Sequence, residues 1–234
     1  MAGWSRCGPG NRAQETGIVK FLPQQSVHRI LYLVLVAAFL LTCIEPPYPE
    51  YFYLEHVPTV PALVLLVILE RRLQMSRLSF VCIALFLALH FVGARYLYSN
   101  VPYDEWCEAL FGWNLTEQLG LRRNHYDRLV HFLFGLLISF PAYRFFQRIL
   151  ELSHGWSMVF TLQFILAVGG LYEVAEWGVA MIFEPEAAEA YNGQQGDVWD
   201  PQRDMLLAAV GAVISLAAIQ VVRWRSASIN SRSA

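Results

Sequence analysis

Long apolar runs, separated by short polar segments, constrain the fold of this sequence more than any other feature. A transmembrane helix needs about 20 mostly apolar residues, with a lower limit near 17. By that measure six helices are predicted, over residues 27–44, 54–69, 78–98, 127–146, 157–183 and 204–222. The second is the weakest, because its charge-free stretch is short and Pro58 and Pro61 would bend or shorten a helix; it could instead be re-entrant. We therefore predict an all-α, polytopic transmembrane helix bundle with about six spans.

The overall composition supports a membrane protein. Hydrophobic residues make up 56% of the 234 residues and charged residues 15%, whereas soluble proteins contain about 45–50% and about 25%. This balance and a net charge of -2 argue against a nucleic-acid-binding domain, a disordered chain or a disulfide-stapled secreted module. The lipid bilayer is thus the expected partner, with no nucleic acid.

The domain organisation follows from the same runs. Residues 1–26 are polar, residues 27–222 would form the membrane domain, and residues 223–234 would form a tail. The first segment lacks the apolar core and small-residue cleavage site of a signal peptide, so we expect the first span to stay in the membrane.

The basic residues predict the orientation. With the N-terminus inside, the cytoplasmic segments hold twelve of the seventeen Lys and Arg residues. The outer side keeps five, which are Arg95, Arg122, Arg123, Arg128 and Arg203. Both termini are therefore predicted to be cytoplasmic.

Ionisable residues inside the spans point to a site, because they are costly in a membrane and usually face a bundle interior or a cavity. All those noted in the last four spans fall toward the outer face. They are His90 and Arg95 in the third span, Asp127 and His131 in the fourth, Glu173 and Glu176 in the fifth, and Asp204 at the start of the sixth. The inner halves of the last three spans offer hydroxyl and amide side chains but no ionisable group, so we expect a one-sided site.

Stripes of small residues continue from these charges at helical spacing. The stripes are Asp127, His131, Gly135, Ser139, then Gly169, Glu173, Glu176, Ala180, then Asp204, Ala208, Gly211, Ser215. Small residues let transmembrane helices approach closely, so the last three spans are predicted to face one another and to bring the charges together. The alternative is that the charges only pair with Arg95, Arg128 or Arg203 and fix the helix packing.

The loop before the sixth span adds two acidic residues. Asp200 followed by Pro201 is typical of a helix N-cap with proline at the first helical position. Asp197 has no such structural role in the pattern, and the glycines near it would allow a tight backbone beside a ligand. We therefore treat Asp197 as a candidate catalytic residue.

Four segments resemble a known family. They are Val101-Pro-Tyr-Asp-Glu-Trp106, Arg123-Asn-His-Tyr-Asp-Arg-Leu-Val-His-Phe132, Tyr172-Glu-Val-Ala-Glu-Trp177 and Gly193-Gln-Gln-Gly-Asp-Val-Trp-Asp-Pro-Gln-Arg-Asp-Met205. Together they resemble the YjdF-like bacterial inner-membrane family, a domain of unknown function, from about the first span to the sixth. Members tend to have threonine where this chain has Gln194. More distantly, the order of motifs is similar to VanZ-like membrane proteins, which are linked to glycopeptide-antibiotic tolerance. The resemblance implies a multi-pass protein of the bacterial plasma (inner) membrane and assigns no reaction.

The first functional hypothesis is a metal-dependent hydrolase or transferase acting on lipid or envelope precursors. Carboxylate and imidazole ligands suit Zn, Mn or Mg, and a bound metal can activate water or polarise a phosphoryl or carbonyl oxygen. The expected ligands are Asp127, His131, Glu176 and Asp204. Catalytic roles fall to Glu173 and Asp197, and substrate binding to His90, Arg95 and Arg128.

Two other functions remain open. Chains of Asp, Glu and His inside membranes also relay protons, so the protein could be a proton-coupled transporter. It could also be a non-catalytic accessory membrane protein whose polar cluster fixes helix packing.

Overall fold

A computed structural model describes residues 22–182, 191 and 193–232, and the regular structure of that part is helical. The helices are α1 (Ser26–Thr42), α2 (Pro49–Glu55), α3 (Thr59–Leu73), α4 (Arg77–Arg95), α5 (Tyr103–Phe111), α6 (Leu115–Gln118), α7 (Tyr126–Arg148), α8 (His154–Ala180) and α10 (Asp200–Arg232). The predicted all-α class is confirmed.

Five stretches of the described chain are long and apolar enough to cross a membrane. They are Pro49–Leu73, Arg77–Arg95, Tyr126–Arg148, His154–Ala180 and Asp200–Ile229. The apolar helix α1 is shorter, with 17 residues, which is the lower limit for a span. Five spans and one short apolar helix agree with the predicted polytopic bundle of about six spans.

Several boundaries differ from the prediction. The second span begins at Pro49 instead of residue 54, and it is broken between α2 and α3 because Pro58 disfavours helical geometry at Val57. Helix α4 ends at Arg95, because Leu97 and Tyr98 adopt positive φ angles. Helix α10 continues through most of the predicted tail, and residue 183 of the fifth span lies outside the described residues.

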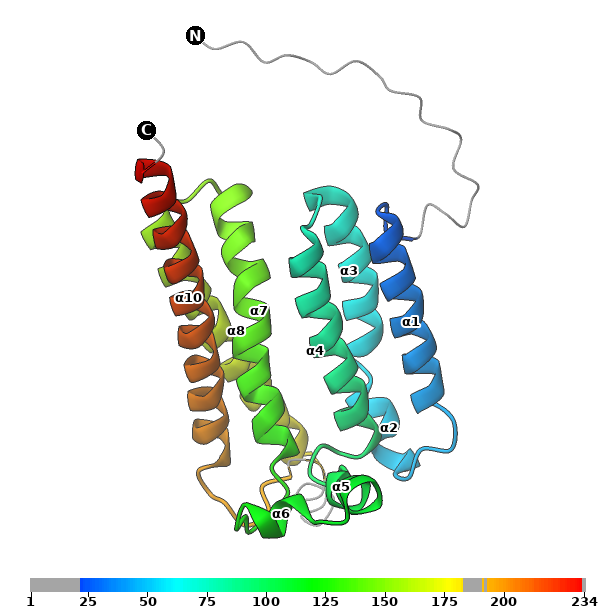
Figure 1. The fold of residues 1–234 in the computed structure, drawn as a ribbon. Coiled ribbons are helices and arrows are strands. Elements are labelled where there is room, and N and C mark those ends of the chain that lie inside the picture. Colours follow the sequence, from blue (N-terminus) through cyan, green and yellow to red (C-terminus); the bar gives the residue numbers. More distant parts are fainter. Residues whose placement is uncertain (1–21, 183–190, 192, 233–234) are drawn as a thin grey trace.

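The helices form two groups of three long helices. Figure 1 shows α1, α3 and α4 on one side and α7, α8 and α10 on the other. The two groups meet where α4 packs against α7. The core of the first group contains Leu66, Phe80 and Phe91, and that of the second contains Ile165 and Ala212. The start of α1 and the end of α10 lie at the same end of the bundle (Figure 1).

Glycines set the close approach of α7 and α10. A Cβ added to Gly135 would overlap the carbonyl oxygen of Ala208, and one added to Gly211 would overlap the carbonyl oxygen of Phe132. The predicted small-residue packing is confirmed for these two helices. It aligns the first two turns of α7 and α10, which carry Asp127, His131 and Asp204.

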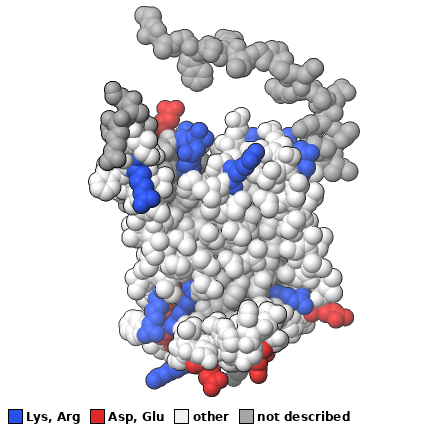
Figure 2. Space-filling model, viewed as in Figure 1, with Lys and Arg blue, Asp and Glu red and all other residues white. Residues whose placement is uncertain are grey.

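Charge separates the two ends of the molecule. Figure 2 shows mostly basic side chains at the end where α1 begins, a broad band without charge, and acidic side chains with several basic ones among them at the opposite end, near α5 and α6, which we call the acidic end. Many apolar side chains of the long helices are exposed, among them Val64, Leu171 and Val213. Such a surface fits a bilayer around the band.

Candidate functional site

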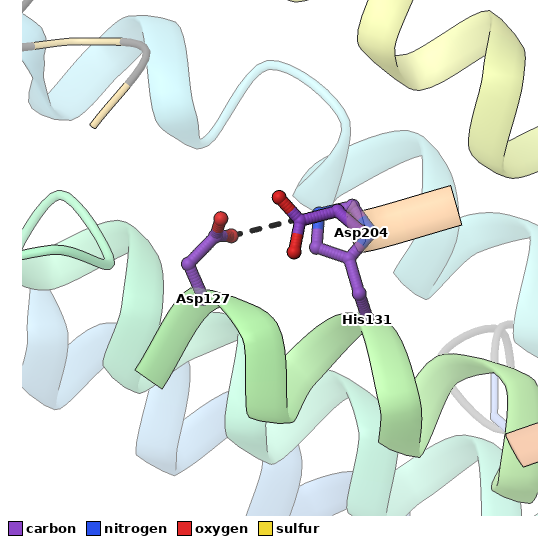
Figure 3. Close-up of side chains that lie close together, drawn as sticks. All are labelled: Asp127, His131 and Asp204. Atoms are coloured by element: carbon purple, nitrogen blue, oxygen red, sulfur yellow. Dashed lines mark ion pairs between the residues drawn. The ribbon is translucent and has the colours of Figure 1, made fainter. Parts of the chain in front are cut away.

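Three side chains at the acidic end of the bundle could hold a metal ion. Asp127 and His131 lie one turn apart near the start of α7, and Asp204 lies in the second turn of α10. In Figure 3, Asp127 and His131 project from the same face of α7 toward Asp204. One ligand atom from each lies within 4.8 Å of the others. The close packing of α7 on α10 brings them together.

Glu173, on α8, adds a fourth group. His131 Nε2 lies 3.6 Å from Asp127 Oδ1 and 3.6 Å from Glu173 Oε1. Both distances are too long for good hydrogen bonds. Ligands held about 2.0–2.2 Å from one tetrahedral ion lie roughly 3.3–3.6 Å apart, so the spacing fits side chains that share a metal.

Two carboxylates of this cluster have a buried oxygen without a partner. Glu173 Oε1 and Asp204 Oδ1 form no hydrogen bond within the described part of the chain, although these residues are only 8% and 2% exposed. A buried polar atom normally has a partner, because leaving it unpaired costs the full desolvation penalty. A bound cation or an ordered water molecule would satisfy these oxygens.

The neighbouring arginines are occupied by other carboxylates. Arg123 binds Asp200 with two hydrogen bonds of 2.6 and 3.1 Å, and Arg128 binds Asp200 at 2.9 Å. Arg128 and Arg203 both bind Asp197. Among the ion pairs of the described residues, neither Arg128 nor Arg203 pairs directly with Asp127 or Asp204.

Asp197, a predicted catalytic residue, is held by two arginines and a backbone N–H. Its carboxylate bridges Arg128 and Arg203 and also accepts a hydrogen bond from the Trp199 N–H at 3.1 Å. Partial burial raises the pKa of Asp197, but the Trp199 N–H and the Arg128 guanidinium outweigh it and hold the pKa below its ordinary value. Asp197 thus has a structural role, because it orders the loop that leads into α10.

Arg95 also has a structural role that the sequence did not indicate. Its guanidinium donates to the carbonyl oxygens of Thr42, Ile44 and Glu45, at 2.6, 2.9 and 3.2 Å. These are carbonyls at the end of α1, where helical partners are missing. The prediction that Arg95 binds substrate beside the cluster is therefore not supported by its position.

The positions of Glu173 and Glu176 relative to His131 differ from those expected for a catalytic residue and a metal ligand, respectively. Both line a small cavity of about 70 Å³ with Asp127 and Asp204. Only Glu173, the predicted catalytic residue, comes within 3.6 Å of His131, while Glu176 was the predicted ligand. The distances favour Glu173 over Glu176 as the fourth ligand.

A second cavity, of about 190 Å³, lies between the two groups of helices. Asp127 and His131 form part of its wall, so it adjoins the cluster. His90 also lines it, and His90 is fixed by hydrogen bonds to Thr59 Oγ1 at 2.7 Å and to the Tyr98 hydroxyl at 2.5 Å. The predicted substrate-binding residue His90 therefore faces this cavity.

Comparison with known proteins identifies the family. Residues 27–225 match the family described as "Predicted membrane protein (DUF2238)". The chain belongs to this family. Inner membrane protein YjdF of Escherichia coli (strain K12) is 32% identical over 164 residues, which cover 70% of this chain and 74% of that protein. No solved structure matches the chain. This DUF2238 chain is thus a YjdF-like, multi-pass inner-membrane protein, as the sequence motifs predicted.

The sequence interpretation of this DUF2238 protein missed a buried pair at the basic end. Glu70 accepts hydrogen bonds from the N–H groups of Gln24 and Gln25, at 2.8 and 3.1 Å, and lies 3.1 Å from His28 Nδ1. His28 stacks on Phe80 with ring centroids 4.3 Å apart. This pair lies in α1 and α3, outside the four spans in which the sequence placed the charged groups toward the outer face. Glu70 thus holds the segment that leads into α1, a role that no local pattern revealed because the partners are more than 40 residues apart.

A second missed group adjoins the larger cavity. His56 Nδ1 lies 2.9 Å from Thr59 Oγ1, which in turn contacts His90, while Glu55 is 4% exposed. Glu55 and His56 lie just before Pro58 in the weakest predicted span. That position was the available signal, since ionisable residues inside an apolar run usually face the protein interior.

Proposed function

We propose that this protein is a metal-dependent hydrolase or transferase of the inner membrane that acts on lipid or envelope precursors. The observation that carries the proposal is the cluster of Asp127, His131, Glu173 and Asp204, in which two buried carboxylate oxygens lack partners. A divalent cation would satisfy those oxygens and offset the mutual repulsion of the carboxylates.

The ligand set favours zinc or manganese over calcium. One imidazole nitrogen and several carboxylate oxygens suit a transition metal, whereas calcium prefers oxygen ligands alone. The bound metal would polarise a phosphoryl or carbonyl oxygen or activate a water molecule. Glu176 lines the same small cavity without a place in the first group of ligands, so it is available to accept a proton there.

The described polar residues argue against a proton path across the membrane. Toward the basic end, Ser139 donates to the Gly135 carbonyl and Thr161 to the Ser157 carbonyl, each at 2.6 Å. These hydroxyls satisfy their own helices instead of linking the cluster to His154 at the other end. The geometry thus favours a site open from one side over the proton-coupled transporter.

Metal content tests the proposal directly. Protein purified without chelator should contain nearly one equivalent of zinc or manganese by elemental analysis, and His131→Ala and Asp204→Ala should lose it while still inserting and eluting as folded protein. The matched control is His125→Ala, which removes a histidine next to α7 that is not part of the cluster. Absence of metal from well-folded wild type would reject the metal site.

The second stage of the test measures whether the metal-loaded protein converts membrane lipid into a product. Metal-loaded wild type would be incubated with vesicles of bacterial inner-membrane polar lipid, and new lipid species would be followed by mass spectrometry. Products should appear with wild type and His125→Ala and be absent with His131→Ala. Metal binding without any product would leave the non-catalytic alternative.

A further inference from the structure

We infer that the larger cavity binds one acyl or prenyl chain of a membrane lipid, which enters sideways from the bilayer between α3 and α8 and brings its polar end to the Asp127–His131–Asp204 cluster. The inference rests on the proposed function, because it names the class of substrate for that site. Three features of the cavity carry it.

The wall of the cavity changes from polar to apolar with depth. Asp127, His131 and Tyr172 line it toward the acidic end of the bundle, and Phe134 and Leu87 line it nearer the middle of the membrane. Phe134 lies seven residues beyond Asp127 on α7, which is about 10 Å along the helix. An occupant must therefore be polar at one end and apolar over the rest of its length.

The cavity reaches the surface at the level of the apolar band. Pro58, just before α3, and Val168, on α8, both line the cavity and are both exposed. The exposed side chains around Val168 on α8, such as Leu166 and Leu171, are apolar. This opening therefore faces lipid tails instead of water, and a lipid can enter without leaving the bilayer.

The volume and Gly169 indicate a single chain. The cavity of about 190 Å³ is only slightly larger than an apolar cavity of about 150 Å³ that holds one benzene molecule, so it has room for the part of one chain next to its polar end and not for two chains. Gly169 lines it and is buried, yet a Cβ added there would meet nothing within 4 Å. The helix thus leaves open space at a position where a side chain would fit.

That open space provides a sharp test by filling the cavity. Gly169→Leu places a side chain in it without a backbone clash, and Ala62→Phe fills it from α3. Gly178→Leu is the matched control, because it also lies on α8 with nothing within 4 Å but does not line the cavity. All variants leave the cluster residues unchanged, so their metal content should equal that of wild type.

The occupant is read out by photo-crosslinking in vesicles of phosphatidylethanolamine and phosphatidylglycerol. One arm contains phospholipid with a diazirine in the acyl chain, and the other contains a diazirine-labelled polyprenyl phosphate. Labelled residues are mapped by mass spectrometry. Leu85, 52% exposed on α4, reports the surrounding lipid, whereas Leu87, 5% exposed on the same helix, is reached only from the cavity.

We expect Leu87 to be labelled in at least one arm, and that arm identifies the chain type. The label at Leu87 should fall about tenfold or more in Gly169→Leu and Ala62→Phe, and remain in Gly178→Leu, with Leu85 labelled equally in all. Labelling of Leu85 alone in wild type, or a Leu87 label that both filling variants leave unchanged, would overturn the inference. The metal content of the same samples tests the proposed function separately, because the absence of metal would not change which residues the lipid labels.

Discussion

Replacing Asp204 with asparagine separates a metal site from a purely structural cluster. Asp204 is 2% exposed, and no arginine or lysine in the described chain forms an ion pair with it. Asn keeps the shape of the side chain and removes its charge. If a metal normally offsets the charge of Asp204, the stability effect of Asp204→Asn must depend on whether metal is present.

The size of the effect follows from the geometry. Two carboxylate charges 4.8 Å apart, the limit for Asp127 and Asp204, repel by about 3.5 kcal/mol at an effective dielectric constant of about 20. Without metal, Asp204→Asn should therefore be more stable than wild type, by an amount on the order of this repulsion. Metal at about 100 times its Kd should stabilise wild type by about 2.7 kcal/mol and leave Asp204→Asn unchanged.

The assay is equilibrium unfolding of detergent-solubilised protein by added sodium dodecyl sulfate, followed by far-ultraviolet circular dichroism. Each protein is measured with chelator and with zinc or manganese. Glu108→Gln is the control, because it removes one acidic charge from an exposed position on α5 at the same end of the bundle. Its stability should not respond to metal differently from wild type.

A metal site at Asp204 would be contradicted if Asp204→Asn were less stable than wild type with chelator and metal stabilised neither protein. That result would mean that the ionised carboxylate of Asp204 is itself stabilising in the metal-free fold. The accessory-protein alternative, in which the cluster fixes helix packing, would then be the better account.

Three further predictions concern packing, pH and topology. Gly135→Leu should destabilise the protein by about 1–3 kcal/mol or more in the same unfolding assay, because its side chain meets backbone of α10, whereas Gly178→Leu should have little effect. Since the pKa of Asp197 lies below its ordinary value of 3.8, its stabilising contribution is present above that pH and is lost as the pH falls through the folded pKa. The difference in thermal midpoint between wild type and Asp197→Asn should therefore stay constant from about pH 8 to about pH 5 and shrink below about pH 4; a difference that grew in acid would contradict the assignment. A reporter inserted at Asn114 should be periplasmic and one fused to the C-terminus cytoplasmic, as the basic residues predict, and the reverse pattern would invert the orientation.

Local sequence patterns were sufficient for the class of fold and for the core of the candidate site. The length of an apolar run determines whether a helix can cross a membrane, so the bundle and the location followed directly. Residues four apart share a helix face, which places Asp127 with His131 and aligns Gly135 with both. The structure brings Asp204 to the same place because Gly135 and Gly211 let α7 and α10 touch.

The sequence by itself determined the helical membrane fold, the one-turn spacing of Asp127 and His131 and the small-residue contact of α7 with α10. The three-dimensional contacts were needed to show which carboxylate each arginine pairs with, that Arg95 caps the end of α1, and that Glu70 holds the segment before the same helix. The tertiary structure also decided that Gly169 faces a cavity instead of a neighbouring helix. Spacing along one helix is a local property of the sequence. The partners of Arg95 and Glu70, in contrast, lie 40 or more positions away in the chain, so no local pattern predicts which groups they bind.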